Sequence, residues 1–450
     1  MKKIKQPAVA GKFYTDDKKE LLNELNEYER KNVKEYDYTT RAIIVPHAGY
    51  FFSGKLASKG FQYLDRKVKN IFIFAPVHTV PTEGIALSEN DIWQTPLGEI
   101  EVNQQINKEL VDKFNGNYFE PAFETEHAIE VQVPFIQKYY SDVKIVPILV
   151  GLTHCSKIAQ IIDYYWQNKD NAFVISSDLS HFYPHSDAVK IDKVTAELIE
   201  TNNTEEFNPQ RACGSLGICG LMEFAKKNEF SLIRVGLTNS AESSGDTSRV
   251  VGYGSWLLYE NSKNNFIKKY FSDTITEYCQ QSIAYGLKNN TPIPTENLEN
   301  IPQVLYQYGA SFVTLTINND LRGCIGSIIA HQSLIKDLVS NAYNAAFADS
   351  RFYPLTEDEY ENVKISISLL SSPEEMDFKD EQDLLNQIRP FIDGIIIKDG
   401  VNQAVYLPSV WEQLPEKVMF LNSLKQKAGL SPHHFSKNFQ AYRYTTEYIN

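Results

Sequence analysis

The chain has 450 residues, 42% of them hydrophobic and 12% aromatic, which is enough core-forming material for two or three folded domains and excludes a disordered chain. Lys and Arg total 44 against 57 Asp and Glu, which gives a formal charge of −13. Proteins that bind nucleic acid usually carry an excess of basic residues, so this charge argues against that function. The longest apolar stretches, IFIFAPV (71–77) and IVPILVG (145–151), are far shorter than the roughly 20 residues that span a bilayer. We therefore expect a globular protein that binds neither nucleic acid nor membrane.

The cysteines and the first residues predict a cytoplasmic protein. The chain reaches Gly11, Lys12 and Tyr14 before an apolar core of a signal peptide forms. The cysteines are odd in number and scattered, with no C-x-x-C pair, which favours reduced thiols. They are Cys155, Cys213, Cys219, Cys279 and Cys324.

The first half of the chain alternates predicted strands with predicted helices. Short runs rich in Val, Ile and Phe are typical of buried strands. They cover 41–49, 71–78, 144–151, 172–181, 231–240 and 250–260. Helical periodicity covers 18–31, 103–114 and 187–200, the last with Ser186 or Asp187 at its N-cap. The alternation predicts a layered α/β domain over residues 1–265.

A polar, aperiodic segment at 260–269 places the domain boundary near 262–270. Beyond it the pattern changes to strands with period-2 alternation, as in VKISISLL (363–370). The other predicted elements are a helix after Ser272 or Asp273, a strand at 310–318, a hairpin at 394–408 turning at Asp399-Gly400, and a helix ending at Gly429. We expect a second, α+β domain over residues 270–450.

Histidines gather in the first domain, where six of the nine fall between residues 47 and 185. Ligands of open α/β sheets bind outside the carboxyl ends of strands, so His47, His78 and His181, which follow predicted strands, are expected to converge there. Converging imidazoles favour a metal site, although a single histidine at a strand end is more often a packing residue. His127 and Glu130 lie at i, i+3, on one face if EHAIEVQVPF is helical.

A carboxylate would complete such a site, and the Ser- and Gly-rich segment 239–254 offers Glu242 and Asp246. The alternative is a surface loop. Two imidazoles and one carboxylate leave coordination positions open, as in non-haem Fe(II) sites that activate oxygen, whereas Zn(II) with the same ligands would activate water. The residues alone do not separate the two metals.

Several motifs in one order then resemble the Memo family over about residues 5 to 260. They are PHAGYFFSG (46–54), APVHTV (75–80), TEHAIEVQVPF (125–135), VPILVG (146–151), SSDLSHF (176–182) and GDTSRVVGYG (245–254). The resemblance implies a fold and a metal site similar to those of class III extradiol dioxygenases, such as the LigB-type subunits. It implies His47, His78 and His181 as pocket residues.

The sequence departs from animal Memo proteins, which have a cysteine in the motif where this chain reads AESSGD. By position, the resemblance then makes Asp246 the third metal ligand beside His47 and His78, with Glu242 as the alternative. His181 and His127 are the expected proton-transfer residues. Asp178 is expected either to orient an imidazole or to cap a strand end.

The C-terminal part resembles the AMMECR family over about residues 272 to 448. The motifs are LRGCIGSI (321–328), NAAFADSRFYPLT (344–356), VKISISLLSSPEEM (363–376) and VYLPSVWEQLP (405–415). A fusion of these two families is similar to proteins B and A of the AmmeMemoRadiSam system, which implies a radical SAM protein as partner.

LRGCIG suggests a second site at Arg322 and Cys324. The glycines would let backbone approach a ligand, and Arg322 could bind a carboxylate or phosphate or lower the pKa of the thiol. A nucleophilic cysteine needs a base, and His331 is seven residues away. Asp349 and Arg351 could contribute to a polar cleft or form a surface ion pair. The alternative is a tight turn with a buried cysteine.

Together these features predict a metal-dependent enzyme that acts on a small organic substrate. The expected cofactor is Fe(II), with Zn(II) or Cu as alternatives, and no separate cofactor-binding residues are predicted. A zinc-dependent hydrolase is the alternative enzyme. The non-enzymatic alternative is a metal- or peptide-binding scaffold for a radical SAM partner.

Overall fold

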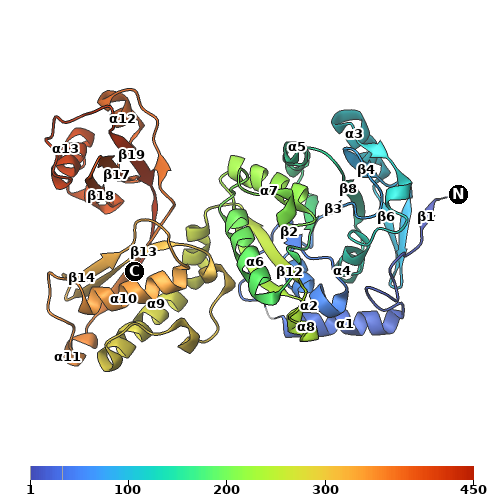
Figure 1. Ribbon diagram of the computed structural model, residues 1–450, viewed down its shortest axis with the longest axis horizontal. Helices are drawn as coiled ribbons and strands as arrows, with labels where there is room; N and C mark the ends of the chain where they lie inside the picture. Colours follow the sequence, from blue (N-terminus) through green and yellow to red (C-terminus); the bar gives the residue numbers. More distant parts are fainter. Residues whose placement is uncertain (1, 33) are drawn as a thin grey trace. The chain divides into compact units, whose positions relative to one another are not determined.

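The computed structural model describes residues 2–32 and 34–450 and divides the chain into two compact units, Met1–Lys263 and Asn264–Asn450 (Figure 1). The first unit combines a large mixed sheet with helices. The second combines antiparallel sheets with helices. These arrangements confirm the predicted α/β and α+β fold classes.

The first unit is built on one sheet, whose strands within the described residues are β1 (Ile4–Lys5), β2 (Ala42–Val45), β3 (Asn70–Pro76), β4 (Ile85–Leu87), β5 (Ile92–Thr95), β6 (Gly98–Val102), β7 (Asn117–Tyr118), β8 (Lys144–Val150), β9 (Asn171–Ser176), β10 (His181–Tyr183), β11 (Ser231–Asn239) and β12 (Val250–Tyr259). The main order is β1-β5-β6-β8-β3-β9-β2-β12-β10, with β11 paired to β12 and β4 paired to β8 and β7. The centre, β8-β3-β9-β2, is parallel.

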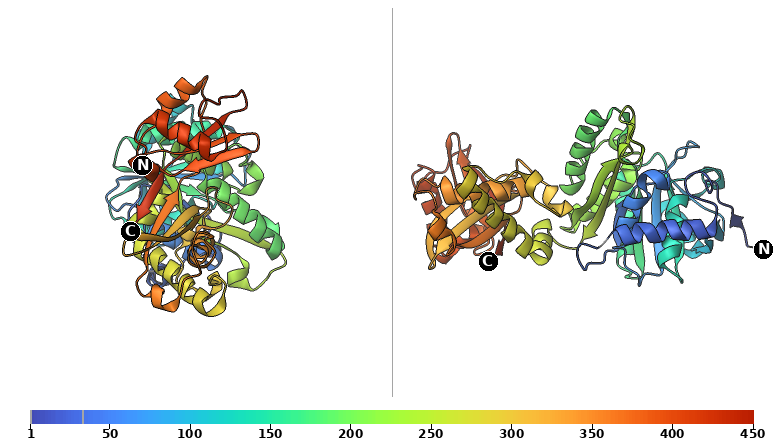
Figure 2. Two further views of the ribbon diagram at one scale, coloured as in Figure 1. Left: turned by 90° about the vertical axis from the view of Figure 1, so that its left-hand side faces the viewer. Right: turned by 90° about the horizontal axis from the view of Figure 1, so that it is seen from below.

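Helices lie on both faces of this sheet (Figures 1 and 2). They are α1 (Lys18–Lys31), α2 (Tyr50–Phe61), α3 (Gln104–Phe114), α4 (Val133–Tyr139), α5 (Cys155–Trp166), α6 (His185–Glu200), α7 (Ser215–Lys227) and the short α8 (Ala241–Ser244). Successive residues of β2 alternate between two cores: Ile43 and Val45 pack with α1, α2 and α4, and Ala42 and Ile44 pack with α3, α5, α6 and α7. Both strand faces are therefore buried, as continuous apolar runs predict.

One predicted helix start is wrong, and another helix is preceded by a helical segment that we did not predict. Helix α6 begins at His185 with Pro184 at its N-cap, so neither Ser186 nor Asp187 caps it. In the second unit, α9 (Lys263–Asn289) is interrupted at Phe271, whose φ of −136° and ψ of 17° are not helical, and its second part begins there, close to the predicted start at Ser272 or Asp273. Its first part, however, begins at Lys263 and covers most of the segment that we predicted as an aperiodic boundary. Buried Phe266 and Ile267 explain this, because their packing outweighs the weak helical periodicity of the surrounding polar residues.

The second unit contains two four-stranded antiparallel sheets, ordered β14-β13-β15-β20 and β16-β19-β17-β18. The strands are β13 (Ala310–Ile317), β14 (Asp320–Gly326), β15 (Lys364–Leu370), β16 (Glu374–Glu375), β17 (Gly394–Asp399), β18 (Asn402–Tyr406), β19 (Gln440–Tyr444) and β20 (Thr446–Ile449). The helices after α9 are α10 (Leu334–Phe347), α11 (Glu357–Tyr360), α12 (Glu381–Gln387) and α13 (Lys417–Lys427). The predicted hairpin turn is confirmed, with Gly400 at φ +61° between β17 and β18.

Within the described part of the chain, we find no helix whose length and apolar character would let it cross a membrane.

Candidate metal centre

Three neighbouring parallel strands support the histidine site at their carboxyl ends. Strand β2 ends at Val45 and is followed by Pro46 and His47, while His78 lies two residues after the end of β3. Strand β9, which lies between them, ends at Ser176. The order β3-β9-β2 therefore brings His47 and His78 to one edge of the sheet, where open α/β sheets bind their ligands.

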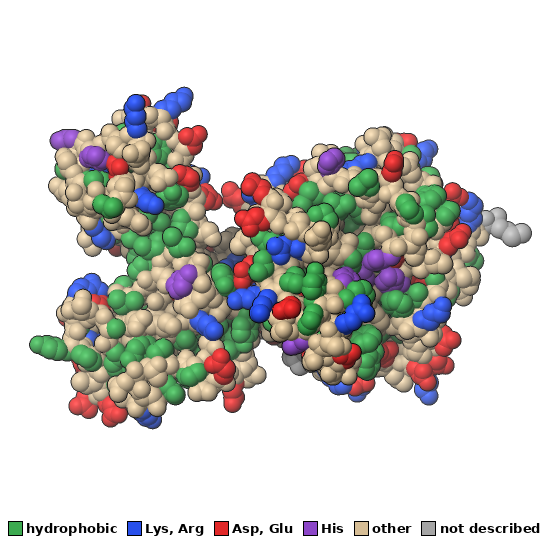
Figure 3. All heavy atoms as spheres, viewed as in Figure 1, with side chains coloured by type: hydrophobic (Ala, Val, Ile, Leu, Met, Phe, Trp, Pro, Cys, Tyr) green, Lys and Arg blue, Asp and Glu red, His purple; other side chains and the backbone are tan. Residues whose placement is uncertain are grey.

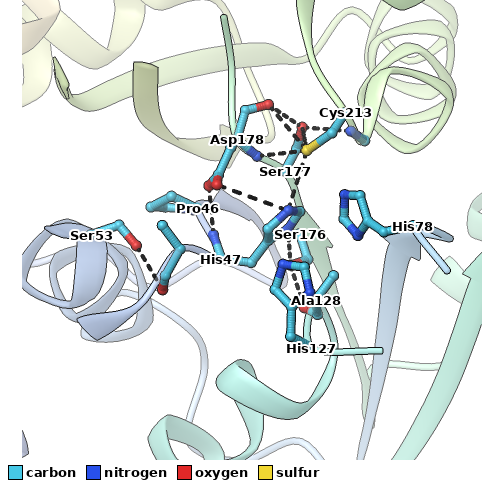
Figure 4. A network of polar contacts seen from close by, with 12 residues as sticks. Pro46, His47, Ser53, His78, His127, Ala128, Ser176, Ser177, Asp178 and Cys213 are labelled. Carbon is cyan, nitrogen blue, oxygen red and sulfur yellow. Dashed lines mark hydrogen bonds and ion pairs between the residues drawn. The ribbon is translucent and has the colours of Figure 1, made fainter. Parts of the chain in front are cut away.

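Three imidazoles meet at this edge (Figure 4). His47, His78 and His127 each offer one ring nitrogen, and these atoms lie within 4.8 Å of one another. The ring centroid of His47 lies 5.3 Å from those of His78 and His127, which are themselves 4.8 Å apart. His127 belongs to the loop before the 3-10 helix η2 (Glu130–Gln132). We call these three residues the histidine cluster. His127, expected as a proton-transfer residue, thus belongs to the group of side chains that could hold a metal ion.

The hydrogen bonds of Ser176 determine which nitrogen of His47 carries the hydrogen. The Ser176 hydroxyl donates to the carbonyl oxygen of Ala128 at 2.7 Å and accepts from Gln132 Nε2 at 2.9 Å. Because its single hydrogen is used, it must accept at 3.0 Å from His47 Nδ1. Burial, together with the neighbouring His127 and His78, holds the pKa of His47 well below its usual value, so the ring is neutral. Nε2 therefore keeps its lone pair.

Glu126 orients the other two rings. Its carboxylate accepts from His78 Nδ1 at 2.9 Å and from the His78 amide at 2.6 Å, and it lies 3.3 Å from His127 Nδ1. Burial opposes the charged form, but the bonds from His78 outweigh it and lower the pKa of Glu126. A carboxylate behind a ligating imidazole is a common arrangement in metal sites, and it leaves Nε2 of His78 free. Sequence reasoning missed Glu126, although it directly precedes His127.

Replacing Glu126 with glutamine is expected to weaken metal binding by about 10–100-fold, because a neutral amide accepts these bonds less strongly. Metal titration against a competing chelator measures the change. Glu124→Gln is the matched control, since Glu124 is exposed two residues away and makes the same change of charge. Equal affinities for the two variants would contradict the orienting role of Glu126.

A thiol and a second carboxylate flank the free nitrogen of His47. Cys213 Sγ lies 3.2 Å from Nε2, and Asp178 Oδ2 lies 4.0 Å from it. Asp178 Oδ1 accepts from the backbone amide of His47 at 2.8 Å, so it holds the backbone of His47. Burial raises the pKa of Asp178 to about 7, and burial together with Asp178 raises the pKa of Cys213 to about 12, so the thiol is neutral.

Sequence reasoning also missed Cys213. Its position is fixed by the residue that follows: a Cβ atom at Gly214 would lie 2.6 Å from the carbonyl oxygen of Ser176, so only glycine fits there. The Cys-Gly pair therefore packs against the end of β9. That pair was the available signal, hidden among five scattered cysteines.

The structure does not bring Asp246 into the histidine cluster, contrary to expectation. Asp246 is exposed, and its carboxylate accepts from the amide and the hydroxyl of Ser248 at 2.8 and 2.7 Å. Both bonds go to Oδ1, and they close a local turn after α8 that holds the carboxylate at the surface. Glu242, the alternative, binds the hydroxyl of Thr238 instead.

His181 and Glu130 also lie outside the cluster. His181 begins β10 and is half-buried, and burial lowers its pKa. Glu130 is buried with both oxygens turned to the N-terminal segment, where they accept from Lys5, Tyr14 and the amides of 8 and 9. His127 and Glu130 therefore do not share a face, because η2 begins only at Glu130.

Arg322 and Cys324 lie on β14 with different partners. Arg322 forms a bidentate ion pair with Glu359, at 2.9 Å for each contact. The Cys324 thiol accepts from the Thr314 hydroxyl at 3.3 Å, and among the described residues no base hydrogen-bonds to it. Asp349 accepts a hydrogen bond from the backbone amide of Cys324 and forms an ion pair with Arg351 at 2.7 Å. This ion pair therefore holds the backbone of β14 in place.

His331, the base nearest to Cys324 in the sequence, is exposed, and its Nδ1 contacts the carbonyl oxygen of Ile329. The described contacts therefore assemble no nucleophile and base around Cys324.

Comparison with known proteins separates the same two parts of the chain. Residues 5–257 match a family model described as Memo-like protein, and residues 276–449 match one described as AMMECR1. A MEMO1 family protein of Aquifex aeolicus is 31% identical over 265 residues, covering 56% of this chain and 97% of the relative. Another from Caldivirga maquilingensis is 31% identical over 281 residues, covering 57% and 99%. A solved structure, the uncharacterized protein PH0010 from Pyrococcus horikoshii, is 27% identical, has a TM-score of 0.37, and covers 39% of this chain and 89% of its own.

Proposed function

This chain belongs to the Memo-like protein family and carries an AMMECR1 domain after it, and on that premise we propose that it is an iron-dependent enzyme that oxidises a small organic substrate with dioxygen. His47, His78 and His127 would hold one Fe(II). The observation that carries the proposal is the histidine cluster, in which bonds to Ser176 and Glu126 engage Nδ1 of His47 and His78 and leave Nε2 of each ring as the nitrogen that could bind a metal. At His47 this nitrogen also contacts the Cys213 thiol at 3.2 Å.

The surroundings of the cluster fit a cation. Asp178 and Glu126 are buried beside the imidazoles, and among the described residues neither carboxylate pairs with a lysine or arginine. A buried carboxylate without a cationic partner is unfavourable, and a divalent metal at the cluster would supply the missing positive charge. Imidazole is a ligand type that suits iron, zinc and copper. When bound, Fe(II) supplies one-electron and dioxygen chemistry.

The chain's own residues would position the reactants and move protons. His78 and His127 have side chains 31% and 22% exposed, so a substrate can approach the cluster from solvent. Figure 3 shows histidine side chains reaching the surface of the first unit on the face drawn. We assign proton transfer to His181, which is half-buried and outside the cluster, and positioning of His47 to Asp178.

The first test is the identity of the metal. The full chain is purified without oxygen and its metal content is measured by elemental analysis, together with that of Asp246→Ala. We expect iron near one per chain in both proteins, because Asp246 is exposed and bonded within its own turn. Iron lost only in Asp246→Ala would restore the ligand set predicted from the sequence. No metal in either protein after reconstitution with iron or zinc would contradict the metal site.

A zinc-dependent hydrolase is the second candidate, and the three-imidazole ligand set favours it, since catalytic zinc sites often use three protein ligands. Zinc, when bound, lowers the pKa of a water so that it attacks an ester or amide at neutral pH. Stoichiometric zinc in the purified protein, with ester hydrolysis retained under nitrogen, would replace the oxidation proposal with this one.

The AMMECR1 domain supports a further expectation, that a radical SAM protein is a partner of this chain. Co-purification of the full chain with the radical SAM protein encoded nearest to it tests this. Co-purification that survives loss of the metal, with no turnover under any condition, would favour a scaffold over an enzyme.

A further inference from the structure

A cavity of about 320 Å³ lies at the same edge of the sheet as the histidine cluster. Its walls come from the end of β3, the end of β8 and the beginning of α7, and they are mainly apolar, with Phe74, Val150, Leu152 and Leu216 among them. Cys213 also lines it, and its sulfur lies 3.2 Å from Nε2 of His47. A molecule in the cavity would therefore reach the thiol that contacts the cluster.

One end of this cavity is polar without being charged. Ser215, the first residue of α7, is 6% exposed, and its hydroxyl makes no hydrogen bond to any residue that the structure describes. Within the same described set, the amides of Leu216 and Gly217 also have no acceptor, whereas those of Ser215 and Ile218 donate to carbonyl oxygens of Ala212 and Gly214. The first turn of this 13-residue helix therefore offers a hydroxyl and two amides at its positive end, which are groups that can together bind an anion.

We propose that this cavity binds the carboxylate of a small organic acid at Ser215 and the first turn of α7, with the apolar body of the acid against Phe74, Val150 and Leu216. The proposal rests on the proposed function and names its substrate class, an apolar monocarboxylic acid. Among the described residues that line the cavity there is no lysine or arginine, so a single negative charge suits it better than the double charge of a phosphate monoester. Its volume suits a small molecule.

Fluorine NMR titration of the full chain tests the charge preference. The probes are 4-fluorobenzoate, the neutral 4-fluorobenzamide of nearly the same shape, and 4-fluorophenyl phosphate. We expect the benzoate to bind at least tenfold more tightly than the amide and more tightly than the phosphate. Equal binding of the benzoate and the amide would overturn the proposal, and so would tighter binding of the phosphate.

Two variants locate the site. Ser215→Ala is expected to weaken benzoate binding five- to tenfold and leave benzamide binding unchanged. Leu152 is 80% exposed at the cavity, so Leu152→Glu and its uncharged control Leu152→Gln should both fold, and only the charged variant should weaken benzoate binding. If the affinity for benzoate is unchanged in both Ser215→Ala and Leu152→Glu, the acid binds elsewhere and the proposal is overturned.

Metal-free protein separates this proposal from the proposed function. Because α7 supplies the binding groups, the benzoate should bind with the same affinity, within about twofold, whether or not the metal has been removed by a chelator. Loss of benzoate binding on metal removal would mean that the acid binds the metal itself and would overturn the subsite. Iron retained in a wild-type protein that binds no benzoate would overturn the subsite alone, while absence of metal with benzoate bound would overturn only the iron proposal.

Discussion

Replacing His78 with alanine is expected to weaken metal binding by roughly a hundredfold to a thousandfold while the chain stays folded. Structural zinc sites with four ligands bind with about 10–16 kcal/mol, which is about 2.5–4 kcal/mol per ligand. Loss of one ligand from the histidine cluster should cost a similar amount. The side chain of His78 is 31% exposed, so its removal leaves no cavity in the core. Metal titration with a competing chelator, beside a thermal melt of the metal-free proteins, measures both effects.

His181→Ala is the control for His78→Ala. His181 is a half-buried histidine near the same sheet edge but outside the cluster, so this variant should keep the affinity for metal within about threefold and lose turnover. A His78→Ala protein that binds metal as tightly as the wild type would contradict the cluster. Equal losses of affinity in both variants would extend the ligand set to His181.

Replacing Gly323 with alanine is expected to destabilise the second unit by about 3 kcal/mol. A Cβ atom at this position of β14 would lie 2.0 Å from the carbonyl oxygen of Ala345 in α10. The obstacle is helix backbone rather than a mobile side chain, so the cost belongs at the upper end of the about 1–3 kcal/mol typical of overpacking. Urea unfolding of the full chain, followed as the transition of the second unit, measures the loss.

Cys324→Ala is the matched control for Gly323→Ala, one residue along the same strand. The Cys324 thiol accepts a single hydrogen bond, from Thr314, so its removal should cost about 1 kcal/mol or less. If Gly323→Ala lowered the free energy of unfolding by no more than Cys324→Ala does, the result would contradict the close contact of β14 with α10.

The contact at Gly323 also corrects how LRGCIG was interpreted. We expected its glycines to let backbone approach a ligand beside Cys324. Gly323 instead admits the backbone of α10, and a Cβ at Gly326 would lie 2.2 Å from the ring of Phe312. Both glycines therefore serve the packing of β14. The alternative of a tight turn with a buried cysteine is also wrong, because the segment is a strand and Cys324 is only half-buried.

The part of the site that the sequence predicted is the part set by strand position. His47 and His78 follow buried strands whose apolar runs are easy to recognise, and parallel strands place their carboxyl ends together. His127, Glu126 and Cys213 come from loops, where no periodicity indicates direction, and their places depend on contacts with β9 that are distant in sequence. Asp246 was assigned by its place in a motif, but short-range bonds to Ser248 fixed it in a surface turn.

The ends of helices were likewise predicted only where local sequence signals define them. The helix over Lys18–Lys31 was predicted to the residue, since its apolar face and capping Asp17 are local features. The beginning of α9 was not predicted, because Phe266 and Ile267 are buried by tertiary packing and the polar residues around them give no sign of it. Where the local sequence signals for a helix or strand are strong, they predict the element. Where these signals are weak, tertiary packing determines whether the element forms.

The hydroxyl of Ser176 forms hydrogen bonds to segments that are distant in the sequence and so restricts their movement relative to one another. It joins the end of β9 to the ring of His47 and to the carbonyl of Ala128, the residue after His127. Two ligands of the cluster are thereby held in place by folding itself, before any ion arrives. The metal-free protein should then keep its shape, and exchange of one divalent ion for another should proceed without unfolding.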